Sequence, residues 1–317
     1  MMKAIVLHHP GDASALSYED VPTPTVKPGW SLLKIKGFGI NRSEIFTRNG
    51  WSPSVHLPRI LGIEGVGVIA DTTDPARLPV GRRAISLMGG LGREFDGSYA
   101  EYALIPNAQL YPVTTKLSWA ELAAVPETWF TAYGSLVNLR LTAQDDLLIR
   151  GATSGVGVAA AKLANALGVH EVIGSTRNLA KTASLQTVGV ASVVADVAGK
   201  LQAQAPIADK ILELVGPATL TDSLRVLRPG GICCVTGELG GVWSADFYPI
   251  SALPTGGYLT AFRSEGVSEA KVQDLLALID AHHLAVAPRK TFTLADTAAA
   301  QAALDAPDSF GKVVVLV

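Results

Sequence analysis

Apolar and polar positions follow two different patterns along the chain. In the first 112 residues, short apolar runs at residues 32–40, 61–70 and 98–105 are bounded by glycine-rich turns and by ten of the 18 prolines. Short strands between such breakers are typical of an irregular β-rich domain. Within this part of the chain, only Arg42–Asn49 has a helical pattern.

From about Leu117 the pattern changes, because apolar runs of four to six residues now alternate with alanine-rich helical segments. This alternation indicates βαβ units around a parallel sheet. The expected strands are 146–150, 171–175, 192–195, 210–215, 231–236 and 258–262, and the expected helices are 156–167, 178–188 and 218–227. The chain is therefore predicted to be an α/β protein, in which a Rossmann-type doubly wound parallel sheet domain accompanies a β-rich domain.

The C-terminal part adds two helices and a strand. Residues 268–283 are amphipathic with Ser268 as N-cap, and residues 296–304 form a second expected helix. Residues 311–317 are almost continuously apolar, so they are expected to form a strand buried on both faces that returns to a sheet of the first domain. We therefore expect a domain of residues 1–118, completed by 284–317, and a nucleotide-binding domain of residues 119–283.

Composition and charge narrow the classes of function. Of the 317 residues 48% are hydrophobic, and 26 Lys and Arg against 28 Asp and Glu leave a net charge of −2. Without a basic excess, nucleic acid is not an expected partner. No uncharged run reaches the roughly 18 to 20 residues that span a bilayer, and the N-terminus lacks a signal-peptide pattern. We therefore expect no membrane association and a cytoplasmic location.

The two cysteines are adjacent, at Cys233 and Cys234 of one expected strand. Their side chains point to opposite faces, which excludes an ordinary disulfide and a zinc knuckle. They are expected to be small buried residues, and a redox-sensitive thiol is the alternative.

A glycine-rich turn, Gly151–Gly157, joins the first strand of the nucleotide domain to its helix. Small residues in such a turn let backbone N–H groups approach a pyrophosphate, and the helix N-terminus adds a fractional positive charge. A strict G-x-G-x-x-G does not fit, because its first two glycines would fall at Ala152 and Ser154. The candidate cofactor-binding residues here are Ala152, Thr153, Ser154, Gly155, Val156 and Gly157. A plain tight turn between strand and helix is the alternative.

The end of the second strand indicates which dinucleotide is expected. An Asp or Glu there would bind both ribose hydroxyls, but the chain has Gly174-Ser175-Thr176-Arg177, with Lys181 one turn later. A 2′-phosphate could accept a hydrogen bond from Ser175 and pair with Arg177 and Lys181. NADPH is therefore expected rather than NADH, unless Arg177 and Lys181 are merely solvated residues at a helix start.

Five segments along the chain carry a family resemblance. They are Gly39–Asn41 with Arg48–Gly50, Leu61–Gly65, Gly97–Tyr102, Gly151–Gly157 and Phe310–Val314. Together they resemble the medium-chain dehydrogenase/reductase superfamily, and within it the zinc-free NADPH:quinone oxidoreductase branch. The resemblance implies that the first domain is GroES-like and catalytic, that the second domain binds NADPH, and that two chains pair as a homodimer through an edge strand near residues 256–262.

The resemblance also implies roles for single residues. Asn41 would lie at the nicotinamide end of the cleft between the domains and position or polarise the acceptor. The further candidate cofactor-binding residues are Thr131, Thr236 and Lys312. The candidate walls of the substrate pocket are Phe46, Trp51 and Trp129, with ordinary packing as the alternative.

The departures from relatives concern the metal and the cofactor. Zinc-dependent members resemble this chain but have a Cys in the segment matching Gly39–Asn41 and a His at Ile63, and an isoleucine cannot ligate zinc. No metal site is therefore expected. Asp196 stands where relatives have a tyrosine that packs at the adenosine end, and its negative charge weighs against NADPH.

With no metal and no obvious proton donor, the expected reaction is direct hydride transfer from NADPH to a small electrophile, a quinone or an α,β-unsaturated carbonyl. An enone or enoyl double-bond reductase is the alternative with the same parts, and it would reduce 2-alkenals in preference to quinones. A zinc alcohol dehydrogenase would contain bound metal. From another class, a non-catalytic NADPH-binding sensor would bind the cofactor without oxidising it.

Overall fold

The computed structural model describes residues 1–317, which form two compact units. Unit 1 consists of Met1–Glu127 and Ser264–Val317, and unit 2 of Thr128–Arg263. Unit 2 is thus inserted between two parts of unit 1.

These limits differ from the boundaries expected from the sequence, because residues 119–127 and 264–283 belong to unit 1. Helix α8 (Glu269–Ala281) lies against β8 (Tyr111–Pro112) of this unit, where Gln273 donates from Nε2 to the carbonyl of Pro112 at 2.8 Å. Helical periodicity identified α8 and its N-cap Ser268, but it does not specify the partner against which a helix packs.

Two β-sheets form the frame of unit 1. In the smaller sheet, β1 (Met2–Leu7) pairs antiparallel with β2 (Leu16–Val21) and with β4 (Arg59–Ile60). The larger sheet contains, in spatial order, β16 (Lys290–Thr293), β17 (Val313–Leu316), β3 (Trp30–Gly39), β5 (Glu64–Thr72), β6 (Arg83–Leu87) and β8 (Tyr111–Pro112), with β7 (Tyr102–Pro106) paired to β3. As its apolar sequence predicted, β17 is buried and returns to this sheet, where Val315 is the partner of Phe38.

Short helices connect the strands of unit 1. They are η1 (Ala13–Ala15), α1 (Arg42–Arg48), η2 (Asn107–Gln109), α2 (Trp119–Ala123), α8, η4 (Leu294–Asp296) and α9 (Thr297–Asp305). Helix α3 (Pro126–Asn138) begins at the boundary, and most of it belongs to unit 2.

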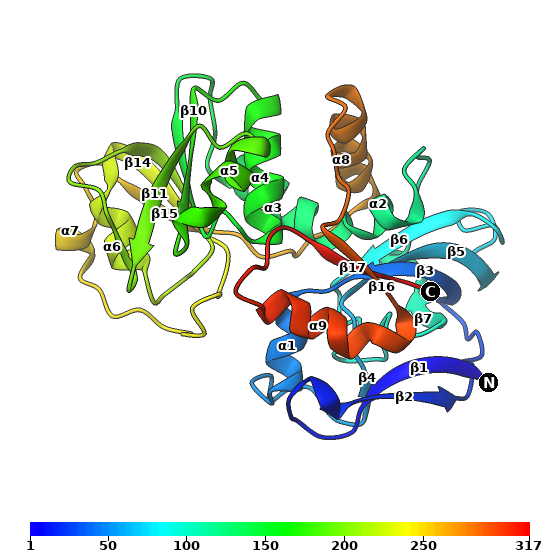
Figure 1. Ribbon diagram of the computed structural model, residues 1–317. Coiled ribbons are helices and arrows are strands. Elements are labelled where there is room, and N and C mark those ends of the chain that lie inside the picture. Colours follow the sequence, from blue (N-terminus) through cyan, green and yellow to red (C-terminus); the bar gives the residue numbers. More distant parts are fainter. The chain divides into compact units, whose positions relative to one another are not determined.

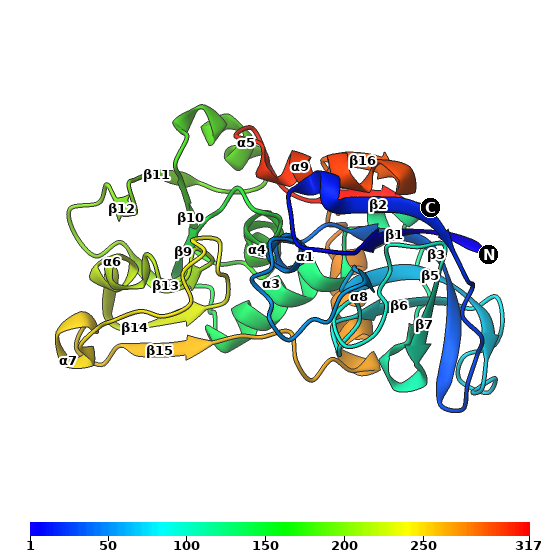
Figure 2. The same cartoon turned by 90° about the horizontal axis from the view of Figure 1, so that it is seen from below.

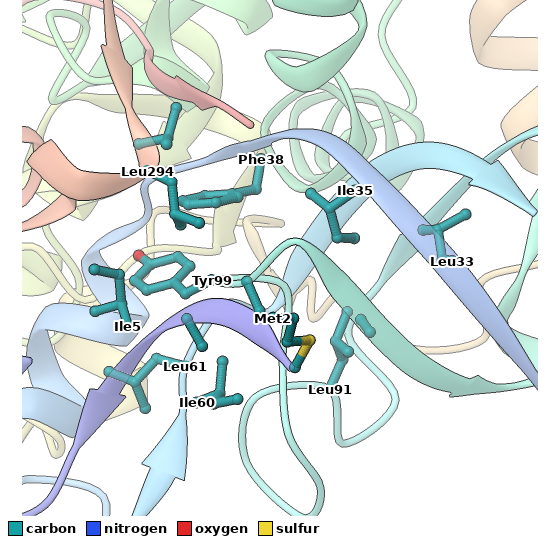
Figure 3. Close-up of a cluster of buried hydrophobic side chains, with 14 of the residues drawn as sticks. Met2, Ile5, Leu33, Ile35, Phe38, Ile60, Leu61, Leu91, Tyr99 and Leu294 are labelled. Carbon is teal, nitrogen blue, oxygen red and sulfur yellow. The ribbon is translucent and has the colours of Figure 1, made fainter. Parts of the chain in front are cut away.

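The core of unit 1 combines residues from distant parts of the chain. Figure 3 shows Ile5 of β1 and Leu294 of η4 beside the rings of Phe38 and Tyr99. The two rings stack with centroids 4.5 Å apart. Burial of these apolar side chains is the main stabilising contribution in such a core, and here it requires the C-terminal segment.

A seven-stranded sheet forms the centre of unit 2. Its spatial order is β12 (Lys200–Leu201), β11 (Ser192–Val197), β10 (Glu171–Thr176), β9 (Asp146–Arg150), β13 (Ala208–Glu213), β14 (Leu227–Val235) and β15 (Tyr258–Ala261). All neighbouring strands are parallel except the pair β11–β12. Six strands thus follow the order of a Rossmann sheet, which confirms the predicted doubly wound fold (Figure 2).

Helices cover both faces of this sheet. Figures 1 and 2 show α4 (Gly155–Ala166) and α6 (Leu220–Arg225) on opposite sides of it. The remaining helices of unit 2 are η3 (Leu179–Lys181), α5 (Thr182–Thr187) and α7 (Pro249–Ala252). The order of strands reverses between β9 and β13, and open α/β sheets bind ligands at the carboxyl ends of the strands beside this point. None of the helices combines the length and the apolar composition needed to cross a membrane.

Candidate active site

The glycine turn of unit 2 lies between β9 and α4. Gly151 has a φ of +84°, and a Cβ on Gly157 would lie 2.7 Å from the backbone of Ala152, so both positions require glycine. Ser154 caps α4 by accepting from the N–H of Gly157 at 3.0 Å. The N–H groups of Thr153, Gly155 and Val156 have no acceptor within the chain. Free N–H groups at the start of a 12-residue helix fit a pyrophosphate.

The end of β10 places the predicted specificity residues in different environments. Ser175 is buried, and its hydroxyl accepts from the N–H of Gly151 at 3.1 Å, so this side chain supports the glycine turn. Arg177 is exposed, and its side chain forms no hydrogen bond or ion pair. Lys181 lies half-buried at the end of η3. A free guanidinium beside a strand end without a carboxylate fits a 2′-phosphate.

Directly before the glycine turn, Arg150 occupies the centre of a buried polar network. Its side chain is fully buried and contacts Asp196 at 3.0 Å and Asp222 at 2.9 Å. Arg150 also donates to Ser223 Oγ at 2.9 Å and to the carbonyl of Thr219 at 3.2 Å. Burial raises the pKa of Asp222, but the Leu201 N–H and the charge of Arg150 lower it more, so the net shift is downward. The carboxylate of Asp196 therefore already has a cationic partner inside the protein.

Two predicted threonines are connected through a third residue of unit 2. Ser135 Oγ donates to the backbone carbonyl of Thr131 at 2.7 Å and lies 2.9 Å from Thr236 Oγ1. Helix α3 is thereby fixed to the carboxyl end of β14. Ser135 could not be identified from the sequence, because a serine inside a helix gives no signal of such a contact.

In unit 1, Asn41 belongs to a closed hydrogen-bond network. Its Nδ2 donates to Glu64 Oε1 at 2.8 Å and lies 3.3 Å from Glu44 Oε1, while its Oδ1 accepts from Lys312 Nζ at 2.6 Å. Lys312 also pairs with Glu64 at 2.7 Å, and the second oxygen of Glu64 accepts from the Glu127 N–H. A Cβ on Gly39 would lie 2.3 Å from Glu64 Oε1, so glycine is required to make room for this network.

Glu44 is the second carboxyl group of this network and is 1% exposed. It accepts from the N–H of Asn41 at 3.1 Å and from the N–H of Ile63 at 3.2 Å. Burial, together with the negative charge of Glu64, raises the pKa of Glu44 from 4.5 to about 7. The capping-box spacing from Asn41 to Glu44 is a signal that could have identified this residue from the sequence.

The proposed pocket residues are distributed over both units. The rings of Phe46 and Trp51 in unit 1 lie 5.5 Å apart, and Trp51 is 52% exposed. Trp129 belongs to unit 2, where it is buried. An exposed indole beside a second ring can offer an apolar surface to a flat substrate.

No group of three or more His, Cys, Asp and Glu residues is arranged to hold a metal ion. Cys233 and Cys234 are free and buried, as their place in a strand predicted. Burial raises the pKa of both thiols.

Comparison with known proteins supports this architecture. Residues 27–115 match the family model of the alcohol dehydrogenase GroES-like domain, and residues 167–315 match a model described as zinc-binding dehydrogenase. A putative quinone oxidoreductase of Bacillus subtilis is 31% identical over 235 residues, which are 71% of this chain and 69% of the relative. This chain belongs to the medium-chain dehydrogenase/reductase superfamily.

Two further members of the superfamily are similar over much of their length. The quinone oxidoreductase of Pongo abelii is 28% identical over 254 residues, covering 76% of this chain and 74% of that protein. The crystal structure of a quinone oxidoreductase from Pseudomonas syringae has the same fold, with a TM-score of 0.86, 23% identity and full coverage of both chains. As a medium-chain dehydrogenase/reductase, the protein is an oxidoreductase that uses a nicotinamide cofactor.

Proposed function

We propose that the protein is an NADPH-dependent reductase that transfers a hydride, without zinc, to a quinone or an α,β-unsaturated carbonyl compound. The observation that carries this proposal is the environment of Asn41, which stands in the segment where zinc-dependent relatives have a cysteine ligand. Its amide nitrogen is directed at two carboxyl groups, and its oxygen accepts from the Lys312 ammonium.

This arrangement is unsuitable for zinc. A catalytic zinc takes about three protein ligands with free lone pairs, whereas Ile63 has none and the oxygen of Asn41 already accepts from the Lys312 ammonium. The Lys312 ammonium would also repel a divalent cation placed at Asn41. One matching family model is described as zinc-binding, but the residues of this chain do not provide the ligands.

A bound nicotinamide supplies the hydride, and the residues of the chain bind and orient the reactants. Because both N–H bonds of the Asn41 amide point to carboxylates, the geometry supports a positioning role for Asn41 rather than direct polarisation of the acceptor. Lys312 Nζ has three N–H bonds, and Asn41 and Glu64 occupy two of them. The third N–H is not used by either of these residues.

The preference for NADPH is supported by the charges at the carboxyl ends of β10 and β11. Arg177 is exposed without a partner, and the carboxylate of Asp196 is neutralised by Arg150. Asp196, whose negative charge weighed against NADPH in the sequence, therefore does not present a free negative charge. The relatives named as quinone oxidoreductases support the choice of acceptor.

The test is steady-state oxidation of NADPH with quinones, 2-alkenals, enones and aldehydes, before and after dialysis against a zinc chelator. We expect turnover with quinones or enones that is unchanged by the chelator. Activity that is lost on chelation and restored by zinc would contradict the metal-free reaction. A clear preference for 2-alkenals over quinones would instead identify the double-bond reductase, and cofactor binding without turnover of any acceptor would identify a sensor.

We also propose a homodimer formed through β15, the edge strand of the unit 2 sheet. This strand pairs with β14 on one side, and its Tyr258 and Leu259 side chains are exposed. A bare edge offers unpaired backbone groups to a second copy of the same strand. Light scattering should give the mass of two chains, and Leu259→Pro, which removes a backbone N–H on the side of β15 away from β14, should reduce it to the mass of one.

A further inference from the structure

We propose that Arg150 determines the cofactor preference indirectly, by holding the carboxylate of Asp196 inside unit 2 and away from a 2′-phosphate. Arg150 is then a positioning residue, since its side chain is fully buried and acts through Asp196. This inference rests on the proposed NADPH preference and explains how that preference tolerates an acidic residue.

The first observation is the position of Asp196 in the sheet. Strands β10 and β11 are parallel, and Thr176 is the partner of Ala195. Asp196 and Arg177 are therefore the next residues of the two chain segments, at the carboxyl ends of adjacent strands. This edge is where a dinucleotide binds in an open α/β sheet, with the adenosine ribose near the end of the second strand.

The second observation is that the Asp196 carboxylate depends on Arg150. Asp196 is 6% exposed, and its Oδ2 accepts from Arg150 Nε at 3.0 Å. Its other oxygen, Oδ1, is buried and has no hydrogen-bond partner. Arg150 is thus the cation that compensates this buried charge, and a buried charge without compensation is strongly unfavourable.

Removal of Arg150 would therefore release the Asp196 side chain. An unpaired carboxylate is stabilised by turning toward water, and Arg177, which follows the adjacent strand β10, is exposed to water. At the carboxyl ends of these adjacent strands, a released Asp196 carboxylate would compete for the guanidinium of Arg177 and repel a phosphate, which carries a charge of about −1.5 to −2. NADH lacks the 2′-phosphate, so its affinity should change much less.

Isothermal titration calorimetry with NADPH and with NADH tests the proposal on the wild type, Arg150→Met, Asp196→Asn and the double variant. We expect Arg150→Met to lower the ratio of NADPH to NADH affinity about tenfold. The double variant should regain the wild-type ratio, because it lacks the released carboxylate. Asp196→Asn alone should keep this ratio within about twofold, since Arg150 already neutralises the carboxylate in the wild type.

Arg225→Met is the matched control. Arg225 also pairs with Asp222, at 3.2 Å, but it donates to Leu201 and Ala203 rather than to Asp196. The substitution Arg225→Met should leave the ratio of NADPH to NADH affinity unchanged. Circular dichroism melting should accompany each titration to show that the variants are folded.

Three results would overturn the inference. The first is an unchanged affinity ratio in folded Arg150→Met, and the second is a lowered ratio that the added Asp196→Asn does not restore. The third is available even if Arg150→Met does not fold: a rise of about tenfold in NADPH affinity in Asp196→Asn alone, which would mean that the carboxylate already acts on the phosphate. A wild type that prefers NADH would contradict the proposed function, whereas the effect of Arg150→Met on the ratio would still be measurable.

Discussion

Lys312 donates from Nζ to the amide oxygen of Asn41 at 2.6 Å, although the two residues are 271 positions apart in the sequence. The contact connects the end of β3 with the start of β17, and Glu64 accepts from the same ammonium. Lys312 is 7% exposed and Glu64 is fully buried, so this ion pair lies inside unit 1. Its two charges depend on each other, because neither is solvated.

Replacement of Lys312 by methionine should therefore destabilise the protein by about 3–5 kcal/mol, since it leaves the Glu64 carboxylate buried without a cation. Urea unfolding followed by circular dichroism measures this loss. Lys290→Met on the neighbouring strand β16 is the control, because Lys290 is exposed, and it should change stability by less than about 0.5 kcal/mol. Equal effects of the two substitutions would contradict the buried pair.

The raised pKa of Glu44 should make stability depend on pH. Its folded-state pKa is about 7 against an ordinary value of 4.5, so between these values the folded chain binds more protons than the unfolded chain. The contribution of Glu44 is thus fully present below pH 4.5 and is lost as the pH rises through 7. The total loss should be about 3 kcal/mol.

Urea titrations of the wild type and of Glu44→Gln between pH 5 and pH 8 measure this dependence. The difference in unfolding free energy between the two proteins should shift in favour of the variant as the pH rises, because glutamine does not ionise. Glu94→Gln, which makes the same substitution at an exposed position, is the control for the loss of a glutamate. A difference for Glu44→Gln that does not change with pH would contradict the raised pKa of Glu44.

Arg177→Ala should raise the Michaelis constant for NADPH about tenfold or more and leave the Michaelis constant for NADH nearly unchanged. The reason is that the substitution removes a guanidinium that pairs with the 2′-phosphate, which NADH lacks. Initial rates with both cofactors and one acceptor give the comparison. Lys200→Ala removes another exposed cation of unit 2 and should affect both cofactors little. Equal effects of Arg177→Ala on the two cofactors would remove the basis for the phosphate contact.

Neither thiol should react in the native protein. Cys233 and Cys234 are buried, and burial raises the pKa of both, so the reactive thiolate is scarce. With Ellman's reagent at pH 8 we expect no release of chromophore before denaturation, and two equivalents per chain in guanidinium chloride. Rapid reaction of one thiol in the folded protein would revive the alternative of a redox-sensitive cysteine.

The alternating pattern of the sequence was sufficient to predict six strands of the unit 2 sheet, the helical segments of α4, α5 and α6, and the Rossmann-type fold. It did not predict β12, α3 or α7. Local signals also identified Ser268 as an N-cap and residues 311–317 as a buried strand. These features depend on neighbouring residues or on the periodicity of burial, which a single sequence contains.

The partners of the polar side chains could not be predicted in the same way. Ser175 accepts from the N–H of Gly151, and Asp196 pairs with Arg150, and neither of these partners is evident from the sequence. Arg150 at the end of the apolar strand β9 was a visible signal, since a charged residue in a buried strand needs a counter-charge. Which carboxylate provides it depends on three-dimensional neighbours that no local pattern specifies.

The discontinuity of unit 1 has a consequence for synthesis of the protein on the ribosome. All residues of unit 2 are made before Ser264, whereas unit 1 still lacks β16, β17 and Lys312 at that moment. Domains generally fold as units during translation. Unit 2 can therefore fold while the nascent chain is still attached, but Glu64 has no counter-charge until Lys312 has left the exit tunnel.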